Sequence, residues 1–142
     1  ISIGNGAQTD VDRVLDRIAA RRPLVLCLPR LSFEANTRTR RNLPAELAKG
    51  GARVVLIPAT DGDEGLASWL ANAALLVRDG LPRAQALRAL TLHPAEVLGL
   101  EGEVGSIEAG KRADLVVLSG DPFDVGTEPV ATLLGGEVVW ET

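Results

Sequence analysis

Two kinds of hydrophobic pattern alternate along the first part of the chain. Residues 23–29 (PLVLCLP) and 52–58 (ARVVLIP) are apolar almost throughout, which is typical of strands covered on both faces. Residues 1–6 (ISIGNG) are also strand-like, residues 11–18 carry apolar positions at the spacing of one helix face, and a short helix is expected over 44–49. The order is therefore strand, helix, strand, helix, strand. This alternation predicts an α/β fold with a parallel sheet.

Three further helices are expected after the last of these strands. Apolar positions at helical spacing run over residues 66–77. A second helix begins at Pro82 and is expected to turn Leu87 and Leu90 inward, and a third covers residues 93–98 (HPAEVL). Three consecutive helices end the alternating region.

Short strands and turn residues replace the helices after Gly102. Gly135 and Gly136 separate the last two of these strands, and a glycine pair at this place predicts a two-residue hairpin turn. We therefore divide the chain into an α/β part, residues 1–101, and an all-β part, residues 102–142. The strands expected in the second part are 104–107 (VGSI), 113–118 (ADLVVL), 130–134 (VATLL) and 137–140 (EVVW).

Composition narrows the partners that this chain is expected to bind. With 142 residues and 46% hydrophobic content, the chain is long enough to bury a core. Its net charge of −4 argues against a nucleic-acid surface, because binding to phosphates depends on clustered lysine and arginine. No run of about 18 apolar residues is present, so no membrane-spanning helix is expected. The expected partner is a small molecule or another protein segment.

The chain starts at Ile1 in strand-like sequence, without an initiator methionine or a signal peptide. We expect further residues of the same protein to precede Ile1, and the compartment stays open, with the cytoplasm favoured. Cys27 is the single cysteine and lies within the apolar run 23–29. We expect it to be a buried, inert thiol.

The segment 30–42 carries four arginines and no apolar period, and we expect it to be a loop. Loops that follow the C-terminal ends of parallel strands form ligand sites. Arg38 and Arg40 are therefore candidates for binding an anionic group of a substrate. The alternative is that both belong to a solvated loop that binds nothing.

Asp61 comes directly after the third apolar strand, in the sequence PATDGDEG. A carboxylate at the end of a parallel strand faces a concave site, where it is able to ligate a metal or act as a base. The alternative is that Asp61 caps the next helix, with Asp63 and Glu64 favouring the helix N-terminus. His93 is the only histidine, and a transition-metal site needs three or four ligands, so we expect it to satisfy backbone groups instead. The chain alone shows no complete active site.

Residues 86–123 (ALRALTLHPAEVLGLEGEVGSIEAGKRADLVVLSGDPF), followed by residues 130–140 (VATLLGGEVVW), closely resemble the C-terminal end of the amidohydrolase superfamily. The resemblance is strongest to its imidazolonepropionase-like and dihydroorotase-like branches. In that family a helix carrying Leu-Thr-x-x-Pro-Ala leads out of a (β/α)₈ barrel, and the chain returns to a small β-sandwich. The resemblance implies that residues 1–101 are the C-terminal part of such a TIM-type barrel, about three βα units, and that residues 102–142 contribute C-terminal strands of the sandwich. Asp114 is then expected to be a hydrogen-bonding residue of a turn or strand start.

The resemblance also implies roles for single residues. Asp61 matches the family's strand-eight aspartate, which binds the metal and takes a proton from the attacking water. A divalent metal, with zinc as the expected ion, is implied for the full-length protein, but its site is not complete in this chain. The family's ligands on strands one, four and five would precede Ile1, and Asn5 stands near the place of the sixth-strand histidine.

Two functions follow from the resemblance. The first is that of a metal-dependent hydrolase of carbon–nitrogen bonds other than peptide bonds, in small substrates that include cyclic amides. The second is that of a degenerate, inactive barrel that acts through binding or assembly. A three-stranded parallel sheet leaves bare edges, which proteins cover. We therefore expect a partner, either the remainder of the barrel or a second copy in a homo-oligomer.

Overall fold

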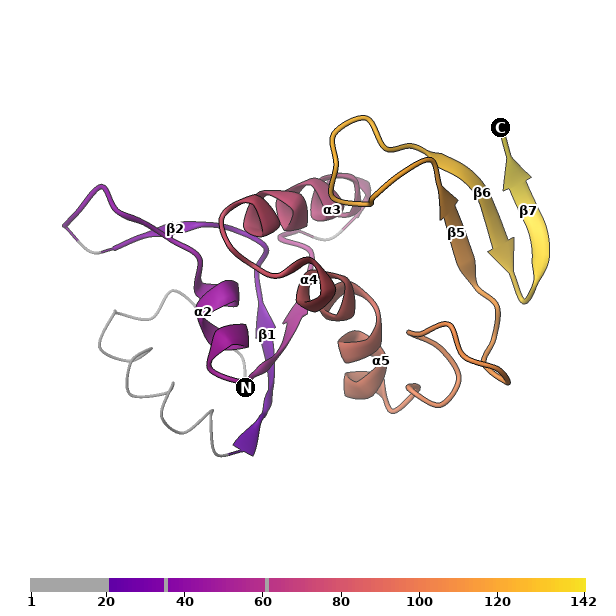
Figure 1. The fold of residues 1–142 in the computed structure, drawn as a ribbon, viewed down its shortest axis with the longest axis horizontal. Coiled ribbons are helices and arrows are strands. Elements are labelled where there is room, and N and C mark those ends of the chain that lie inside the picture. Colours follow the sequence, from indigo (N-terminus) through magenta and orange to yellow (C-terminus); the bar gives the residue numbers. More distant parts are fainter. Residues whose placement is uncertain (1–20, 35, 61) are drawn as a thin grey trace.

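A computed structural model describes residues 21–34, 36–60 and 62–142 of the chain (Figure 1). The strand predicted over residues 1–6, the helix predicted over 11–18, Asn5 and Asp61 lie outside the described residues. The predictions that concern them stay predictions.

Two parallel strands with a helix between them confirm the predicted α/β alternation. β1 (Leu24–Cys27) and β4 (Arg53–Leu56) pair in parallel and in continuous register. The connection between them contains α2 (Leu43–Lys49), the short helix expected from the sequence. Pro44 stands in the first turn of α2, where a proline is tolerated because the first helical N–H groups have no partner within the helix.

One face of this strand pair forms the core of the described structure. Val25 and Cys27 of β1 share the face with Val54 and Leu56 of β4. The remaining side chains of β1 are only half-buried, so the predicted cover on both faces holds for β4 but not for β1 among the described residues. The rest of the core cluster comes from helices and loops, namely Leu47, Ala52, Ala73, Leu76, Leu81, Ala86, Ala89 and Phe123.

Three consecutive helices follow β4, as the sequence predicts. They are α3 (Asp63–Arg78), α4 (Arg83–Leu90) and α5 (Leu92–Leu98). α5 ends at Gly99, whose left-handed φ of 71° glycine adopts without steric cost. None of the helices within the described ranges is long and apolar enough to cross a membrane.

The inward face of α4 agrees with the prediction at Leu90, which packs against the core cluster, but differs at Leu87. Leu87 is 48% exposed, whereas Ala86 and Ala89 are fully buried and Leu90 is half-buried. α4 packs against β4, and small alanine side chains allow a helix to approach a sheet closely. The prediction considered hydrophobicity and not side-chain size, and it therefore named the leucines of α4 instead of its alanines as the inward residues.

The arginine-rich segment 30–42 was predicted to be a loop, and this prediction is wrong in part. It contains a short antiparallel ladder of β2 (Ser32–Phe33) and β3 (Arg40–Arg41). All four strand residues are exposed or half-buried, so no hydrophobic alternation marks the hairpin in the sequence. Backbone hydrogen bonds close its tip, including Glu34 N–H to the Thr39 carbonyl at 3.0 Å.

The C-terminal part is a three-stranded antiparallel sheet in the order β5 (Leu115–Leu118), β6 (Pro129–Leu134) and β7 (Glu137–Glu141). Gly135 and Gly136 have φ values of 59° and 90° and form the turn between the last two strands, which confirms the predicted hairpin. In Figure 1 this sheet lies at the end of the molecule opposite β2.

The strand predicted over residues 104–107 is wrong, because residues 104–106 form bends and residue 107 belongs to no strand. Gly105 has a φ of 91°, which does not fit an extended strand. Its Cα also faces α5 so closely that an added Cβ would lie 2.9 Å from the Ala95 Cβ. The backbone therefore packs on α5 instead of pairing in a sheet.

The sheet is attached to the helices mainly through the loop between β5 and β6. No residue of the three strands is buried, but Phe123 in that loop is 8% exposed and belongs to the core cluster. Arg83 at the start of α4 forms ion pairs with Asp121 and Asp124 on either side of it. The sequence Gly120-Asp121-Pro122-Phe123 therefore ends a strand, as predicted, and also anchors the sheet.

Candidate functional site

The turn that follows β4 is the place where the sequence predicts chemistry. β4 ends at Leu56, and α3 begins at Asp63 after Gly62, which has a φ of 89°. Gly62 is the N-cap residue and has no side chain to accept a helix N–H, whereas Asp63 and Glu64 lie in the first turn, as expected near a helix N-terminus. Asp61 lies outside the described residues, so its catalytic, metal-binding and capping roles all stay predictions.

Two residues of α3 contact the described residues at the start and in the middle of this turn. The Trp69 indole Nε1–H donates a hydrogen bond to the Leu56 carbonyl oxygen, at 3.1 Å. Gly65 is buried, and a Cβ added to it would overlap the carbonyl oxygen of Thr60. α3 is therefore fixed against both the end of the strand and the middle of the turn.

The structure places the two arginines that the sequence singles out in different surroundings. Arg38 is exposed and lies between the two strands of the hairpin. Arg40 lies in β3, its side chain is 56% exposed, and its Nη1 is 3.4 Å from the Asp79 carboxylate. The role of Arg38 and Arg40 in substrate binding stays a prediction.

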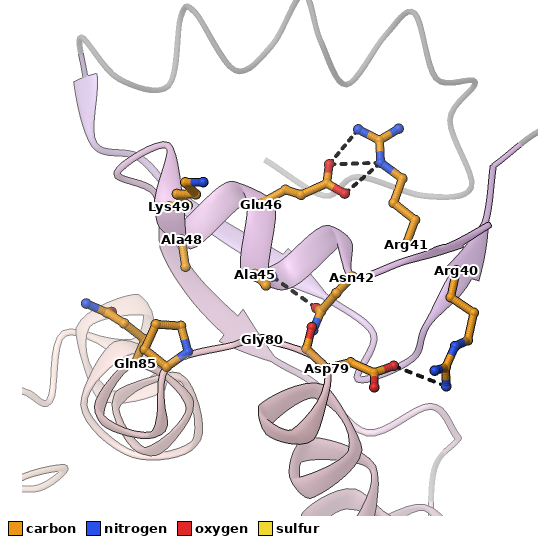
Figure 2. Close-up of a pocket in the computed structure, with 11 residues that line it drawn as sticks. Arg40, Arg41, Asn42, Ala45, Glu46, Ala48, Lys49, Asp79, Gly80 and Gln85 are labelled. Carbon is orange, nitrogen blue, oxygen red and sulfur yellow. Dashed lines mark hydrogen bonds and ion pairs between the residues drawn. The ribbon is translucent and has the colours of Figure 1, made fainter.

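Arg40 also lines a cavity of about 450 Å³ between α2 and the junction of α3 with α4 (Figure 2). Neither Arg38 nor the described residues of the turn after β4 belong to its lining, so the cavity is separate from the predicted catalytic turn. Arg41 and Glu46 also line the cavity, and the Arg41 Nε lies 2.8 Å from both carboxylate oxygens of Glu46. Figure 2 shows this pair and the Arg40–Asp79 pair on opposite sides of Asn42. Within each pair the two charges neutralise each other, and Lys49 adds a further positive charge to the lining.

Asn42 is the central residue of this contact and was missed by the sequence reasoning. Its Oδ1 accepts the Ala45 N–H at 3.1 Å and thereby caps α2. Its Nδ2 donates to the carbonyl oxygens of Leu76 at 2.8 Å and Asp79 at 3.1 Å, at the end of α3. One buried amide therefore fixes the start of one helix against the end of another. An asparagine directly before the sequence Leu-Pro was the available signal, since asparagine is a preferred N-cap residue.

His93 and Cys27 have the structural roles that the sequence predicts. The His93 Nδ1 lies 2.7 Å from the Val54 carbonyl oxygen, so this nitrogen carries the proton and donates to β4. Burial raises the pKa of the Cys27 thiol to about 11, which keeps it protonated at neutral pH. Within the described ranges no group of three His, Cys, Asp or Glu side chains is arranged to hold a metal ion. The described residues alone therefore do not make a metal centre.

Asp114 confirms its predicted role at the start of a strand. Its Oδ1 accepts the Gly135 N–H at 2.9 Å, and its Oδ2 accepts from the Arg112 Nε at 2.6 Å. The hydrogen bond from Gly135 and the Arg112 side chain lower the pKa of this half-buried carboxyl below its ordinary value. Asp114 thus connects the start of β5 to the hairpin turn between β6 and β7.

A parallel strand pair joined through a helix, followed by further helices and a small antiparallel sheet, places the described residues in the mixed α/β class. The family model described as "Amidohydrolase family" matches residues 50–140. This match covers more than half of the chain, and the chain belongs to the amidohydrolase family.

Individual relatives agree with this assignment. The chain is 47% identical over 58 residues to an N-substituted formamide deformylase of Arthrobacter pascens, which covers 41% of this chain and 11% of the relative. It is 41% identical over 73 residues to an adenine deaminase of Chelativorans sp. (strain BNC1), which covers 51% of this chain and 11% of the relative. Both named reactions break a bond between carbon and nitrogen.

The fold is similar to that of a solved amidohydrolase from Thermotoga maritima MSB8. The TM-score is 0.73 at 30% sequence identity, over 94% of this chain and 36% of that protein. The chain therefore spans about a third of this solved structure and about a tenth of the two curated relatives.

Proposed function

We propose that the full-length protein is a metal-dependent hydrolase of carbon–nitrogen bonds other than peptide bonds, in small substrates that include cyclic amides. The chain supplies the C-terminal βα units of the barrel and the strands of a small β-sandwich. The observation that carries this proposal is the family match over residues 50–140, which includes the strand β4 and the turn with Asp61.

Asp61 is the residue on which the chemistry rests. In this proposal its carboxylate is one ligand of a divalent metal, zinc, and accepts a proton from the attacking water. A bound metal ion lowers the pKa of water and polarises the bond to be hydrolysed. The described residues form no metal centre, and in this proposal the other ligands lie before β1, where the family resemblance places them.

Arg38 and Arg40 are proposed to bind an anionic group of the substrate. Both side chains are exposed, and the pair between Arg40 and Asp79 is long at 3.4 Å. Exposed ion pairs contribute little to stability, so Arg40 is able to exchange Asp79 for a ligand at small cost.

The partners follow from the surfaces that the chain leaves uncovered. Val116, Leu134 and Val138 are each more than half exposed, although they lie in strands of the C-terminal sheet. Apolar sheet faces of this kind are covered in stable proteins. The remainder of the barrel or a second copy in a homo-oligomer is proposed to cover them, and neither nucleic acid nor membrane is a partner.

A second candidate function is favoured by one observation in the sequence. Asn5 stands near the position at which the family resemblance places a histidine ligand. A protein that has lost this ligand would keep the barrel as a binding or assembly scaffold without hydrolysis.

The test uses the full-length protein and its Asp61→Asn variant. Metal content is measured by mass spectrometry, and hydrolysis is measured against a panel of N-formyl compounds, cyclic amides and aminopurines. We expect a bound divalent metal, and we expect Asp61→Asn to remove nearly all turnover, because an amide does not take a proton from water. Asp63→Asn in the first turn of α3 is the matched control and should keep full turnover. A metal-free, inactive wild-type protein would favour the scaffold, and full turnover by a folded Asp61→Asn variant would end the catalytic assignment.

A further inference from the structure

The cavity between α2 and the junction of α3 with α4 is large enough for a small organic ligand. Its volume is about 450 Å³, and small-molecule sites in proteins have volumes of about 300–1,000 Å³. Gly80 belongs to its lining, and a Cβ added to this residue would meet no atom within 4 Å. The space beside Gly80 is therefore open, and the chemistry of the lining decides which ligand fits.

Several polar side chains of the lining are already engaged with the protein itself. Both carboxylate oxygens of Glu46 lie 2.8 Å from the Arg41 Nε. The Asn42 Oδ1 accepts the Ala45 N–H, and the Asn42 Nδ2 donates to two carbonyl oxygens at the end of α3. These groups hold α2 against α3 and do not need a ligand.

Three other side chains of the lining are available to a ligand. In the described part of the chain, no hydrogen bond or ion pair involves the side chain of Lys49 or of Gln85. The Arg40 side chain is 56% exposed, and its Nη1 lies 3.4 Å from the Asp79 carboxylate. A guanidinium group has five N–H donors, so Arg40 is able to keep this ion pair and bind a second anionic group.

The two available cations lie at opposite ends of the cavity. Lys49 is the last residue of α2, and Arg40 lies in β3, before the helix begins. Figure 2 shows Lys49 and Gln85 at one end and Arg40 at the other, with Ala45 and Gly80 between them. The helix rises by about 1.5 Å per residue, so roughly 10 Å separates the two ends.

The charge of the lining favours an anion. Three cationic and two anionic side chains line the cavity, which leaves one positive charge in excess. Both anionic side chains are paired with an arginine of the lining. Hydrogen bonds between ionised groups are about twice as strong as those between neutral groups, so a ligand with an anionic group at each end gains most from this arrangement.

We infer that the cavity binds a small, elongated organic dianion. One anionic group contacts Lys49 and Gln85, the other contacts Arg40, and the carbon chain lies along the apolar part of the lining. This site goes beyond the proposed function, because the described residues of the turn after β4 do not line the cavity. Arg40 has a role in both proposals, whereas Lys49 and Gln85 have a role in this one alone.

The test measures binding to the full-length protein by isothermal titration calorimetry. The probes are straight-chain dicarboxylates of increasing length, from succinate through adipate to suberate. Hexanoate is the matched control ligand, because it has the carbon chain of adipate and only one carboxylate. Lys49→Gln and Arg40→Gln each remove one cation. Arg88→Gln is the matched control variant, since Arg88 is exposed on α4 and does not line the cavity.

We expect one dicarboxylate to bind more tightly than its shorter and longer neighbours and at least about tenfold more tightly than hexanoate. Lys49→Gln and Arg40→Gln should each weaken its binding by about tenfold, and Arg88→Gln should stay within about twofold of wild type. The same dicarboxylate should raise the thermal unfolding midpoint of wild type, because a ligand that binds the folded state stabilises it. This rise should be smaller in Lys49→Gln.

Three results would overturn the inference. The first is that no dicarboxylate binds wild type at up to millimolar concentration. The second is binding that either Lys49→Gln or Arg40→Gln leaves unchanged, or that Arg88→Gln weakens equally. The third is equal binding of hexanoate and adipate, which would exclude a site with two anion-binding ends. Binding is measured without turnover, so a wild-type protein that hydrolyses no substrate would end the proposed function and leave this test intact.

Discussion

Phe123 provides the sharpest test of how the C-terminal sheet is attached. Its side chain is 8% exposed within the core cluster, although the strands on either side of its loop contain no buried residue. Its own N–H donates to the Asp121 Oδ1 at 2.8 Å, which shapes the loop around it. Replacing Phe123 by alanine therefore removes the main apolar contact between the loop and the helices.

The expected cost is about 3 kcal/mol of unfolding free energy. Core Phe→Ala substitutions cost about 3–5 kcal/mol. The lower end applies because Phe123 lies at the edge of the cluster, in a loop that is able to fill part of the space left by the removed ring. Phe33→Ala is the matched control, since Phe33 is the only other phenylalanine and is 65% exposed. Its effect should stay within about 0.5 kcal/mol.

Urea denaturation followed by circular dichroism measures both costs, and hydrogen exchange locates them. In Phe123→Ala, exchange should rise in β5, β6 and β7 before it rises in β1 and β4. A Phe123→Ala protein within about 1 kcal/mol of wild type, with unchanged exchange in the sheet, would refute the conclusion that this loop anchors the sheet. The ion pairs of Arg83 with Asp121 and Asp124 would then be the remaining attachment.

Two further predictions concern the buried polar groups. Asn42→Ala should lower the unfolding free energy by about 2–3 kcal/mol, because it removes the cap of α2 and both hydrogen bonds to the end of α3. Asn42→Ser should recover about 1 kcal/mol, because serine restores the cap alone. Equal urea midpoints for the two variants would contradict this division between the cap and the two other hydrogen bonds. Burial raises the pKa of the Cys27 thiol from 9.0 to about 11, so the unfolded chain loses its thiol proton first and stability should fall as pH rises from 9.0 to about 11, with no effect of this group below that range. Urea midpoints measured across this range should show the decline in wild type and a smaller one in Cys27→Ala, whereas parallel curves would show that the thiol does not contribute.

Local patterns were reliable where neighbouring residues alone decide the structure. The uninterrupted apolar runs became the parallel strands β1 and β4. The glycine pair at 135–136 became the hairpin turn, since both positions need a positive φ. His93 was expected to satisfy backbone groups, and it does so, but its partner is the carbonyl of Val54 in β4, which is distant in the sequence and was not predicted.

Predictions failed where the shape of a distant neighbour decides. Residues 104–107 were predicted to form a short strand, but Gly105 packs against α5 and has a positive φ. In α4 the leucines gave the stronger hydrophobic signal, yet the close approach to β4 buries Ala86 and leaves Leu87 exposed. The hairpin in segment 30–42 carries no alternation, because none of its strand residues is buried.

In the candidate site, too, local features could be predicted from the sequence and contacts made by the fold could not. Asp61 was proposed from the sequence because its position directly after an apolar strand is a local feature and matches the family pattern, and its role stays a prediction. Gly65 and Trp69 were not found, since their importance lies in contacts with Thr60 and Leu56 that depend on how α3 folds back. A glycine within a helical pattern was the one local hint, as such glycines often have a packing reason.

The amino-acid sequence by itself determined the helices α2 to α5, the strands β1, β4, β5, β6 and β7, the glycine turn at 135–136, and the family to which the chain belongs. These properties depend on backbone preferences and on the spacing of apolar residues within a few positions of one another. Only the tertiary structure decided that Phe123 anchors the sheet, that Asn42 joins α2 to α3, and that Gly65 lies against Thr60. The physical reason is that burial, hydrogen-bond partners and steric fit are properties of residue pairs, and many of these pairs are brought together only when the helices pack on the sheet.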